Sequence, residues 1–328
     1  MSEQLFDILG IFVFMVGLCI GSFLNVVALR AFTGESIVLP PSKCPKCGEK
    51  IKPYDNIPVL SWLILGGQCR NCKNSISIQY PIVELLTGFG FLMFYYHFKR
   101  FFIGTDIIFQ QAVLLPFFLI IFCIAIVISI TDIKEKVVFD VHTISLAIVI
   151  LIFQFMAGNL INSLIGLVIG ALSMEFLSGL GWILVRKRAF GTGDTYIAAA
   201  IGALLGAKMF FYALITAVII QVLCVIPSYI KKLYKNQEYR TLLMSAIFCS
   251  LIIMYKIAFI DSFSDILKYL FIVLMMIVGL YLCKLLLSVK SLKDNPSYWP
   301  FGPSLLISMF LVAFYGGDIA HFISTIFY

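Results

Sequence analysis

Hydrophobic residues along this chain are gathered into long runs, each about the length needed to cross a lipid bilayer. A transmembrane helix needs about 20 predominantly apolar residues. Short polar connections between the runs hold most of the charged residues. The pattern predicts spanning helices at 5–29, 81–97, 110–130, 141–157, 162–185, 209–230, 242–260, 266–288 and 303–322, with a shorter apolar helix at 195–205.

The overall composition agrees with this pattern. Hydrophobic residues make up 61% of the 328 residues and charged residues only 12%, whereas soluble domains carry about 25% charged residues. The composition therefore excludes an ordinary soluble protein. We predict an all-α polytopic membrane protein with about ten transmembrane helices, in direct contact with the lipid bilayer.

The distribution of positive charge predicts the orientation in the membrane. A net charge of +7 fits nucleic acid, anionic lipid or a topology signal equally well. The basic residues cluster in a few loops, however, and six of them lie in the polar segment 31–80. Cytoplasmic loops are enriched in Lys and Arg. We therefore expect this segment in the cytoplasm, the N-terminus outside and no nucleic-acid partner, although Lys99 and Arg100 fall on the outer side.

The first hydrophobic run resembles a membrane helix more than a removable signal. No basic region precedes it, and no small-residue cleavage site follows it. Secretory signal peptides carry both features. We expect a retained first span.

Four of the nine cysteines lie in the cytoplasmic loop, as CPKC at 44–47 and CRNC at 69–72, with 21 residues between the two motifs. Two such knuckles can present four thiolates to one tetrahedral Zn²⁺. Disulfides are the first alternative and are disfavoured in a reducing cytoplasm. A redox motif is the second, and the duplication argues against it. We predict a small zinc knuckle domain with one structural zinc, held by Cys44, Cys47, Cys69 and Cys72.

Three aspartates lie at the cytoplasmic ends of predicted spans: Asp132, Asp140 and Asp194. Two carboxyl groups at one membrane face can share a water, one acting as base and the other as acid. Such a site needs no metal. The alternatives are a helix cap for Asp194 and solvated charges for the other two. Gly191 and Gly193, before Asp194, would let an extended substrate approach the backbone closely.

Seven stretches occur in an order that is specific to one family. They are GSFLNVVALR (21–30), PPSKCPKCG (40–48), YDNIPVLSWLILGGQCRNCKNSIS (54–77), YPIVELLTG (80–88), TDIKEKVVFD (131–140), FGTGD (190–194) and WPFGPSLL (299–306). Together they resemble the type IV prepilin peptidases of bacterial cell membranes.

The resemblance implies an intramembrane aspartyl endopeptidase at the cytoplasmic face of the bacterial cytoplasmic membrane. It would cleave the basic leader of prepilins or pseudopilins and methylate the new N-terminus from S-adenosylmethionine. By the family motifs, Asp132 and Asp194 are catalytic and Asp140 is supporting. The sequence departs from the family pattern at Phe139, where Pro is usual, and at Tyr196, where Lys is common.

The resemblance also implies a binding site for the methyl donor. The sequence has no G-x-G-x-x-G after a strand, so a Rossmann cofactor domain is not expected. Gly67 and Glu84 are the candidate donor contacts, with a knuckle turn and a membrane-edge ion partner as structural alternatives. The alternative functions are a peptidase without methylation, a transporter with proton-relay carboxylates and an assembly scaffold.

The expected organisation has five parts. These are a first span at 1–30, the zinc knuckle domain at 31–80, the peptidase core at 81–230, an inserted segment with two further spans at 231–300 and a last span at 301–328. The inserted segment could take part in association into a homo-oligomer, and the sequence does not decide whether such an oligomer forms.

Overall fold

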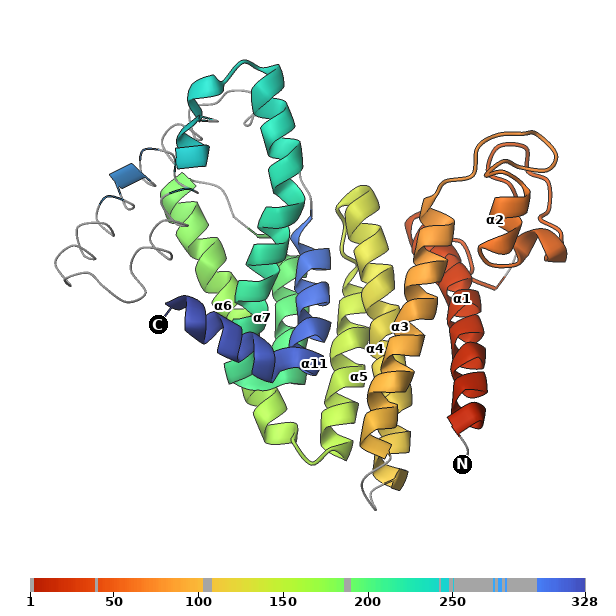
Figure 1. Cartoon of the computed structure of the whole chain (residues 1–328), viewed down its shortest axis with the longest axis horizontal. Helices are drawn as coiled ribbons and strands as arrows, with labels where there is room; N and C mark the ends of the chain where they lie inside the picture. Colours follow the sequence, from red (N-terminus) through yellow and green to blue (C-terminus); the bar gives the residue numbers. More distant parts are fainter. Residues whose placement is uncertain are drawn as a thin grey trace. The chain divides into compact units, whose positions relative to one another are not determined.

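The computed structural model describes residues 3–38, 41–102, 108–185, 190–241, 243–247 and 300–327, together with 250, 274, 277, 278 and 281. These residues are mostly helical, and they contain no β-strand beyond two isolated bridges, Lys43–Lys50 and Gln68–Ser75. The predicted all-α class is therefore confirmed for this part of the chain (Figure 1).

The helix boundaries follow the hydrophobic runs closely. The helices are α1 (Glu3–Thr33), the short α2 (Leu60–Ile64), α3 (Gln79–Phe102), α4 (Ile108–Glu135), α5 (Asp140–Met156), α6 (Leu160–Val185), α7 (Thr192–Lys235) and α11 (Phe301–Phe327), with a 3-10 turn η1 (Pro53–Asn56). Five predicted spans each lie inside one helix, and the span predicted at 141–157 ends one residue beyond α5. The predicted helices at 195–205 and 209–230 both lie in α7, on either side of a kink at Gly206 (φ 76°, ψ 167°).

Five of the described helices contain a segment long and apolar enough to cross a membrane: Asp7–Thr33, Leu115–Glu135, Leu160–Leu180, Thr192–Lys235 and Phe301–His321. α5 is apolar but shorter. Large side chains on these helices are left exposed, such as Phe12 (63%), Phe176 (66%) and Leu223 (64%). Exposure of this kind indicates contact with lipid. The chain is therefore a multi-pass membrane protein.

The predicted spans at 242–260 and 266–288 lie almost wholly outside the described residues. The count of about ten spans accordingly stays a prediction. The predicted span at 81–97 lies in α3, which is not among the five helices named above.

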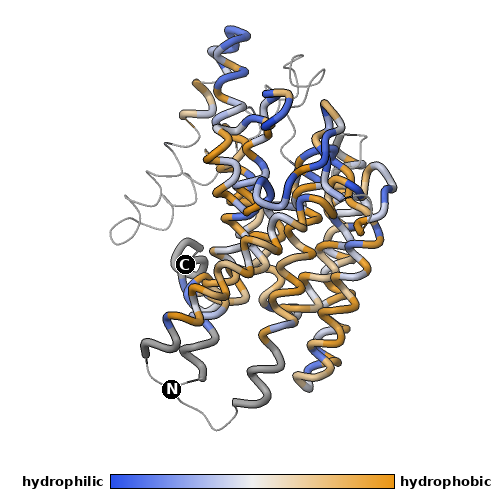
Figure 2. Tube along the Cα trace, turned by 90° about the vertical axis from the view of Figure 1, so that its right-hand side faces the viewer, coloured by the Kyte–Doolittle hydropathy of each residue, from blue (hydrophilic) through white to orange (hydrophobic). Residues whose placement is uncertain are grey.

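The chain divides into two compact units, Met1–Ala217 with Pro300–Tyr328, and Val218–Trp299. All the candidate site residues belong to the first unit. Within it, α1 packs along α3 and α4, and α4 packs against α5 and α11. The N-terminus and the cysteine loop lie at opposite ends of α1 (Figure 1). In Figure 2 the helices are hydrophobic along most of their length, and hydrophilic residues gather at the end where this loop emerges.

The main hydrophobic core of the first unit lies where α4, α5, α7 and α11 meet. Its fully buried side chains include Ile121, Leu146, Ile150, Ile197, Ile201 and Met309. α6 joins this core through a backbone approach, because a Cβ atom at Gly166 or Gly202 would overlap the other glycine's carbonyl oxygen. Small residues commonly allow such close packing between membrane helices.

Candidate active site

Asp132 and Asp194 lie close together at one end of this core. Asp132 is in the last turn of α4, four residues beyond the core residue Ile128, and Asp194 is in the first turn of α7, three residues before Ile197. The two carboxyl groups are near enough for a direct charge–charge interaction. Residues 62 positions apart in the sequence are thus paired because one helix ends where the other begins.

The carboxyl group of Asp132 is buried, with the side chain only 6% exposed. The backbone of Gly302, in the first turn of α11, lies against it. Oδ2 of Asp132 has no hydrogen-bond partner among the described residues. Buried polar atoms are normally hydrogen-bonded, so this oxygen is an acceptor that a bound water or substrate group can satisfy. The interpretation of Asp132 as a solvated charge is wrong.

Asp194 is held by the glycine turn that precedes it. The backbone amide of Gly191 donates a hydrogen bond to Asp194 Oδ2 at 3.3 Å. α7 begins at Thr192, so the carboxylate lies in the first turn and accepts from the residue that precedes the helix. A carboxylate in this position stabilises the helix N-terminus. The Asp194 side chain therefore both caps α7 and lies close to Asp132.

The two glycines of the turn have different surroundings. A Cβ atom at Gly193 would lie 2.6 Å from Cβ of Val138, in the connection between α4 and α5. Gly193 is thus required for packing inside the protein. Gly191 is exposed, and a Cβ atom there would have no neighbour closer than 3.9 Å. Its predicted role in substrate approach stays a prediction.

Asp140 is not brought into the carboxylate pair. It is the first residue of α5, and its side chain is exposed. The solvated-charge interpretation fits this residue. No side-chain contact of Asp140 in the described part of the chain supports its predicted supporting role, which stays a prediction.

Glu175 of α6 was not singled out from the sequence, yet it is part of the site. Its Oε1 accepts a hydrogen bond from the hydroxyl of Thr195, at 3.0 Å, and Thr195 is buried beside Asp194. One turn further along α6, Ser178 donates to the carbonyl oxygen of Phe190 at 3.4 Å. The signal in the sequence was a lone acid within an otherwise apolar run, which is rare in membrane helices.

The four cysteines of the loop converge on one point. Their Sγ atoms all lie within 4.8 Å of one another, and those of Cys44 and Cys72 are 3.9 Å apart. Sulfurs at about 2.3 Å from a tetrahedral zinc are about 3.8 Å from each other, whereas a disulfide is about 2.05 Å long. All four thiols are free. The cluster can therefore bind one metal ion.

The two knuckles repeat one backbone turn. The amide of Cys44 donates to Glu49 and that of Cys69 to Asn74, and the residue after each second cysteine, Gly48 or Lys73, has positive φ. Backbone amides of Cys47 and Lys46 lower the pKa of the Cys44 thiol to about 6. The thiolate form of Cys44 is thus favoured near neutral pH, whereas a backbone hydrogen bond at Glu49 is outweighed by burial and the neighbouring thiols, which raise the pKa of Cys47 to about 11.

An ion pair connects η1 to the second knuckle. Arg70 binds Asp55 through two nitrogens, with distances of 2.6 to 3.1 Å. This hydrogen bonding holds the pKa of Asp55 below its usual value. The pair fixes the loop around the cysteines.

Comparison with known proteins agrees with this geometry. The family model described as "Bacterial Peptidase A24 N-terminal domain" matches residues 15–98. The model described as "Type IV leader peptidase family" matches residues 119–226. A type 4 prepilin-like proteins leader peptide-processing enzyme of Escherichia coli is 33% identical over 58% of this chain and 74% of that protein. The chain belongs to the type IV leader peptidase family.

Other relatives of this family share the same region. A prepilin leader peptidase/N-methyltransferase of Myxococcus xanthus is 37% identical over 60% of this chain, and the match spans 56% of that protein's length. One of Neisseria gonorrhoeae is 32% identical over 58% of this chain and 72% of its own length. No solved structure matches. The paired aspartates and the four cysteines lie within the two matched regions, and 231–300 lies outside both.

Gly67 and Glu84, the two candidate contacts of the methyl donor, both make contacts within the protein. Gly67 (φ 67°) lies under the ring of Trp62, which a Cβ atom would approach to 2.9 Å, and its carbonyl accepts from the Ile76 amide at 2.7 Å. Glu84 is 6% exposed and accepts from the Val59 amide at 2.7 Å. Gly67 thus lies in a knuckle turn, and Glu84 ties the loop to α3, while the role of both residues at the methyl donor stays a prediction.

Proposed function

We propose that this protein removes the leader peptide of type IV prepilins or pseudopilins and methylates the new N-terminal amine. The proximity of Asp132 and Asp194 within the region matched to the leader peptidases is the observation that carries the proposal. Paired carboxylates in a partly desolvated site provide both a base and an acid near neutral pH. No metal ion is needed for this step.

The peptidase step uses the two carboxyl groups in turn. The ionised carboxylate takes a proton from water, whose oxygen attacks the scissile carbonyl carbon. The protonated partner donates its proton to the carbonyl oxygen. Collapse of the tetrahedral intermediate breaks the C–N bond: the first carboxyl group gives its proton to the departing amine, and the second takes back a proton from the hydroxyl that becomes the carbonyl oxygen. The unpartnered Oδ2 of Asp132 supports a water position beside this residue.

The bilayer takes part in substrate binding. In this proposal the N-terminus lies outside, and 81–230 forms the peptidase core among about ten spans of the bacterial cytoplasmic membrane. The apolar helix of the prepilin enters from the lipid, and its basic leader stays on the cytoplasmic side. Both carboxylates lie at helix ends beside the polar loops, where such a junction would reach them.

The four cysteines hold one structural zinc ion in this proposal. The spacing of their sulfurs supports Zn²⁺. A bound zinc supplies folding free energy to a loop too small to bury a core. The methylation step takes its methyl group from S-adenosylmethionine.

Replacing either paired aspartate tests the peptidase. We expect Asp132→Asn and Asp194→Asn each to lower prepilin cleavage by about a thousandfold, because general acid–base catalysis contributes about 10²- to 10⁴-fold. Cleavage is measured with purified protein in detergent, by the mobility shift of the prepilin.

Asp140→Asn is the matched control and should cleave within about twofold of the unsubstituted protein. Normal cleavage by either of the other two variants would reject the mechanism. Mass spectrometry of the product tests methylation separately, since an unmethylated N-terminus would leave a peptidase alone.

A further inference from the structure

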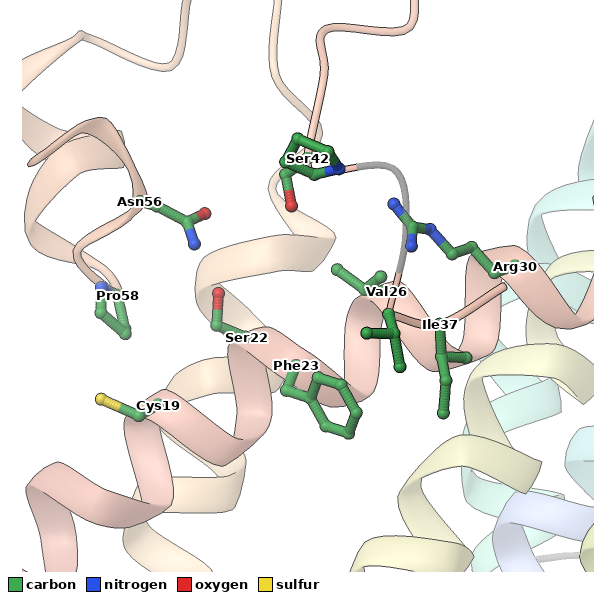
Figure 3. A pocket seen from close by; sticks show the side chains of 11 residues that line it. Cys19, Ser22, Phe23, Val26, Arg30, Ile37, Ser42, Asn56 and Pro58 are labelled. Atoms are coloured by element: carbon green, nitrogen blue, oxygen red, sulfur yellow. The ribbon is translucent and has the colours of Figure 1, made fainter. Parts of the chain in front are cut away.

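The cysteine loop folds back along the membrane helices just before α2. Asn56 and Pro58 of the loop line a cavity of about 300 Å³ together with Cys19 and Ser22 of α1 (Figure 3). Cys19 is about 21 Å from the C-terminal end of α1, since a helix rises about 1.5 Å per residue. This part of the loop therefore lies beside the membrane-spanning segment of α1.

A hydrogen bond fixes the level at which α2 begins. The amide of Val59, the residue before α2, donates to Oε2 of Glu84 at 2.7 Å. Glu84 is buried in α3, about one turn after its first residue, Gln79. The hydrophobic run of α3 begins at residue 81. α2 therefore begins level with the edge of the hydrocarbon region, where the polar headgroups of a bilayer start.

The outer face of α2 is apolar. Its three large side chains, Leu60, Leu63 and Ile64, are 54%, 61% and 79% exposed, whereas Ser61 is buried. Residues three and four positions apart share one side of a helix, so the three side chains form a single patch. A helix with its small polar residue inside and its large apolar residues outside is unsuited to water. The patch therefore indicates apolar surroundings.

This patch continues the lipid-facing surface of the neighbouring helices. Phe23 of α1, which lines the same cavity as Pro58, is half exposed, and so is Ile82 in the first turn of α3. Both residues belong to hydrophobic runs that cross the membrane. Lipid that covers these two side chains therefore covers the patch on α2 at the same level.

The polar side chains next to the patch are of the kind found at membrane interfaces. In η1, which packs against α2, the ring of Tyr54 contacts two cations: Lys52 Nζ is 5.8 Å from its centre and the guanidinium carbon of Arg70 is 5.4 Å from it. Asp55, the only acid of η1, is bound by Arg70. Segment 31–80 holds six basic residues against three acidic ones. Tyrosine is enriched at the headgroup level, and basic side chains are attracted to anionic lipid.

We propose that α2 is an interfacial anchor, inserted into the bilayer leaflet on the side of the cysteine loop. Leu60, Leu63 and Ile64 contact acyl chains, and Lys52 and Tyr54 contact the phosphate headgroups of anionic phospholipid. Lipid is favoured over a protein partner because the patch is continuous with lipid-facing helices and its border is positively charged. The anchor holds the loop against the membrane surface, in addition to its covalent links to α1 and α3. This role of α2 is independent of the proposed activities.

Photocrosslinking of the full-length protein in nanodiscs tests the anchor. Benzoylphenylalanine is placed at Ile64, the most exposed position of α2, and the lipid is phosphatidylcholine mixed with phosphatidylglycerol. Mass spectrometry should find phospholipid attached at this position. The same substitution at Glu49, an exposed residue of the first knuckle, is the matched control and should give no lipid adduct. Leu63 is a second labelling position if the Ile64 variant fails to fold.

A charge substitution tests the headgroup contact. With the label at Ile64, Lys52→Gln should lower the share of phosphatidylglycerol among the adducts about fivefold, the effect of one basic residue near an anionic membrane surface. Lys46→Gln, which removes an equal charge in the first knuckle, should leave that share unchanged. The melting temperature of each variant shows that it is folded.

Three results would overturn the proposal. Folded protein labelled at Ile64 or Leu63 could give no lipid adduct, or adducts to a second copy of the chain, and α2 would then face water or form a protein interface. Lipid adducts could be equally frequent at Glu49, and the contact would then not be specific to α2. An unchanged phosphatidylglycerol share in Lys52→Gln would reject the anionic headgroup. Prepilin cleavage by the unsubstituted protein is measured separately, so failure of the anchor leaves the peptidase proposal standing.

Discussion

Gly302 shows how narrowly the geometry around Asp132 is set. A Cβ atom at this position would overlap Oδ2 of Asp132 and lie 3.2 Å from Cδ1 of Ile197. The residue is buried, and the rings of Phe190 and Phe301 beside it are in contact, with centroids 5.1 Å apart. A side chain at this position would therefore force the Asp132 carboxyl group or the first turn of α11 to shift.

Gly302→Ala should lower kcat for prepilin cleavage by about a hundredfold, because displacing a catalytic group by ~1 Å costs a factor of that order. Alanine favours helices over glycine, so helix propensity would act in the opposite direction. Cleavage rates of purified protein check the effect. Gly317→Ala, on the same helix with no atom within 4 Å, is the control and should cleave normally. Equal rates for the two variants would show that Gly302 does not fix Asp132.

At the scale of elements, α6 holds the turn that carries Asp194. Glu175 accepts from Thr195, and Ser178 donates to the carbonyl of Phe190, so the turn is bound on both sides of Asp194. These contacts make Glu175 a positioning residue. It acts on the carboxylate through its neighbour in the chain.

Glu175→Ala should lower kcat about fivefold with little change in KM, since one hydrogen bond contributes about 1 kcal/mol. Glu175→Gln keeps an acceptor oxygen and should restore most of the rate. Steady-state kinetics with a prepilin substrate separates the two parameters. A loss of equal size in both variants would point to the charge of Glu175 instead of its hydrogen bond.

At the scale of the first unit, helices join the cysteine loop to the carboxylate pair in the described part of the chain. Glu84 fixes the loop to α3, while α1 packs along α3 and α4. The loop lies outside the core in which Asp132 and Asp194 are placed. Loss of the metal ion should therefore affect the two proposed activities unequally.

The purified protein should contain about one zinc per chain, and the Cys44→Ser, Cys72→Ser double variant should contain none, because two thiolates cannot hold the ion as four do. We expect methylation to be lost and cleavage to be retained in larger part. Metal analysis and mass spectrometry of the product measure the three quantities. A native protein without metal would reject the zinc site.

Much of this architecture was predictable because it depends on local patterns. Hydrophobic runs fix where membrane helices form, since a backbone in lipid must satisfy its own hydrogen bonds. The C-x-x-C pairs indicated a four-thiolate cluster, and the ordered motifs indicated the family. The match between predicted spans and helices from α1 to α6 follows from this local character.

Only the tertiary structure decided which side chains meet. Asp132, Asp140 and Asp194 look alike in the sequence as acids at span ends, but burial and helix packing pair the first with the third and leave Asp140 exposed. Glu175 and Gly302 join the site through contacts across helices. Composition and periodicity determine that helices form and cross the bilayer, whereas helix ends are brought together by the fit of side chains in the core, which is not a local property.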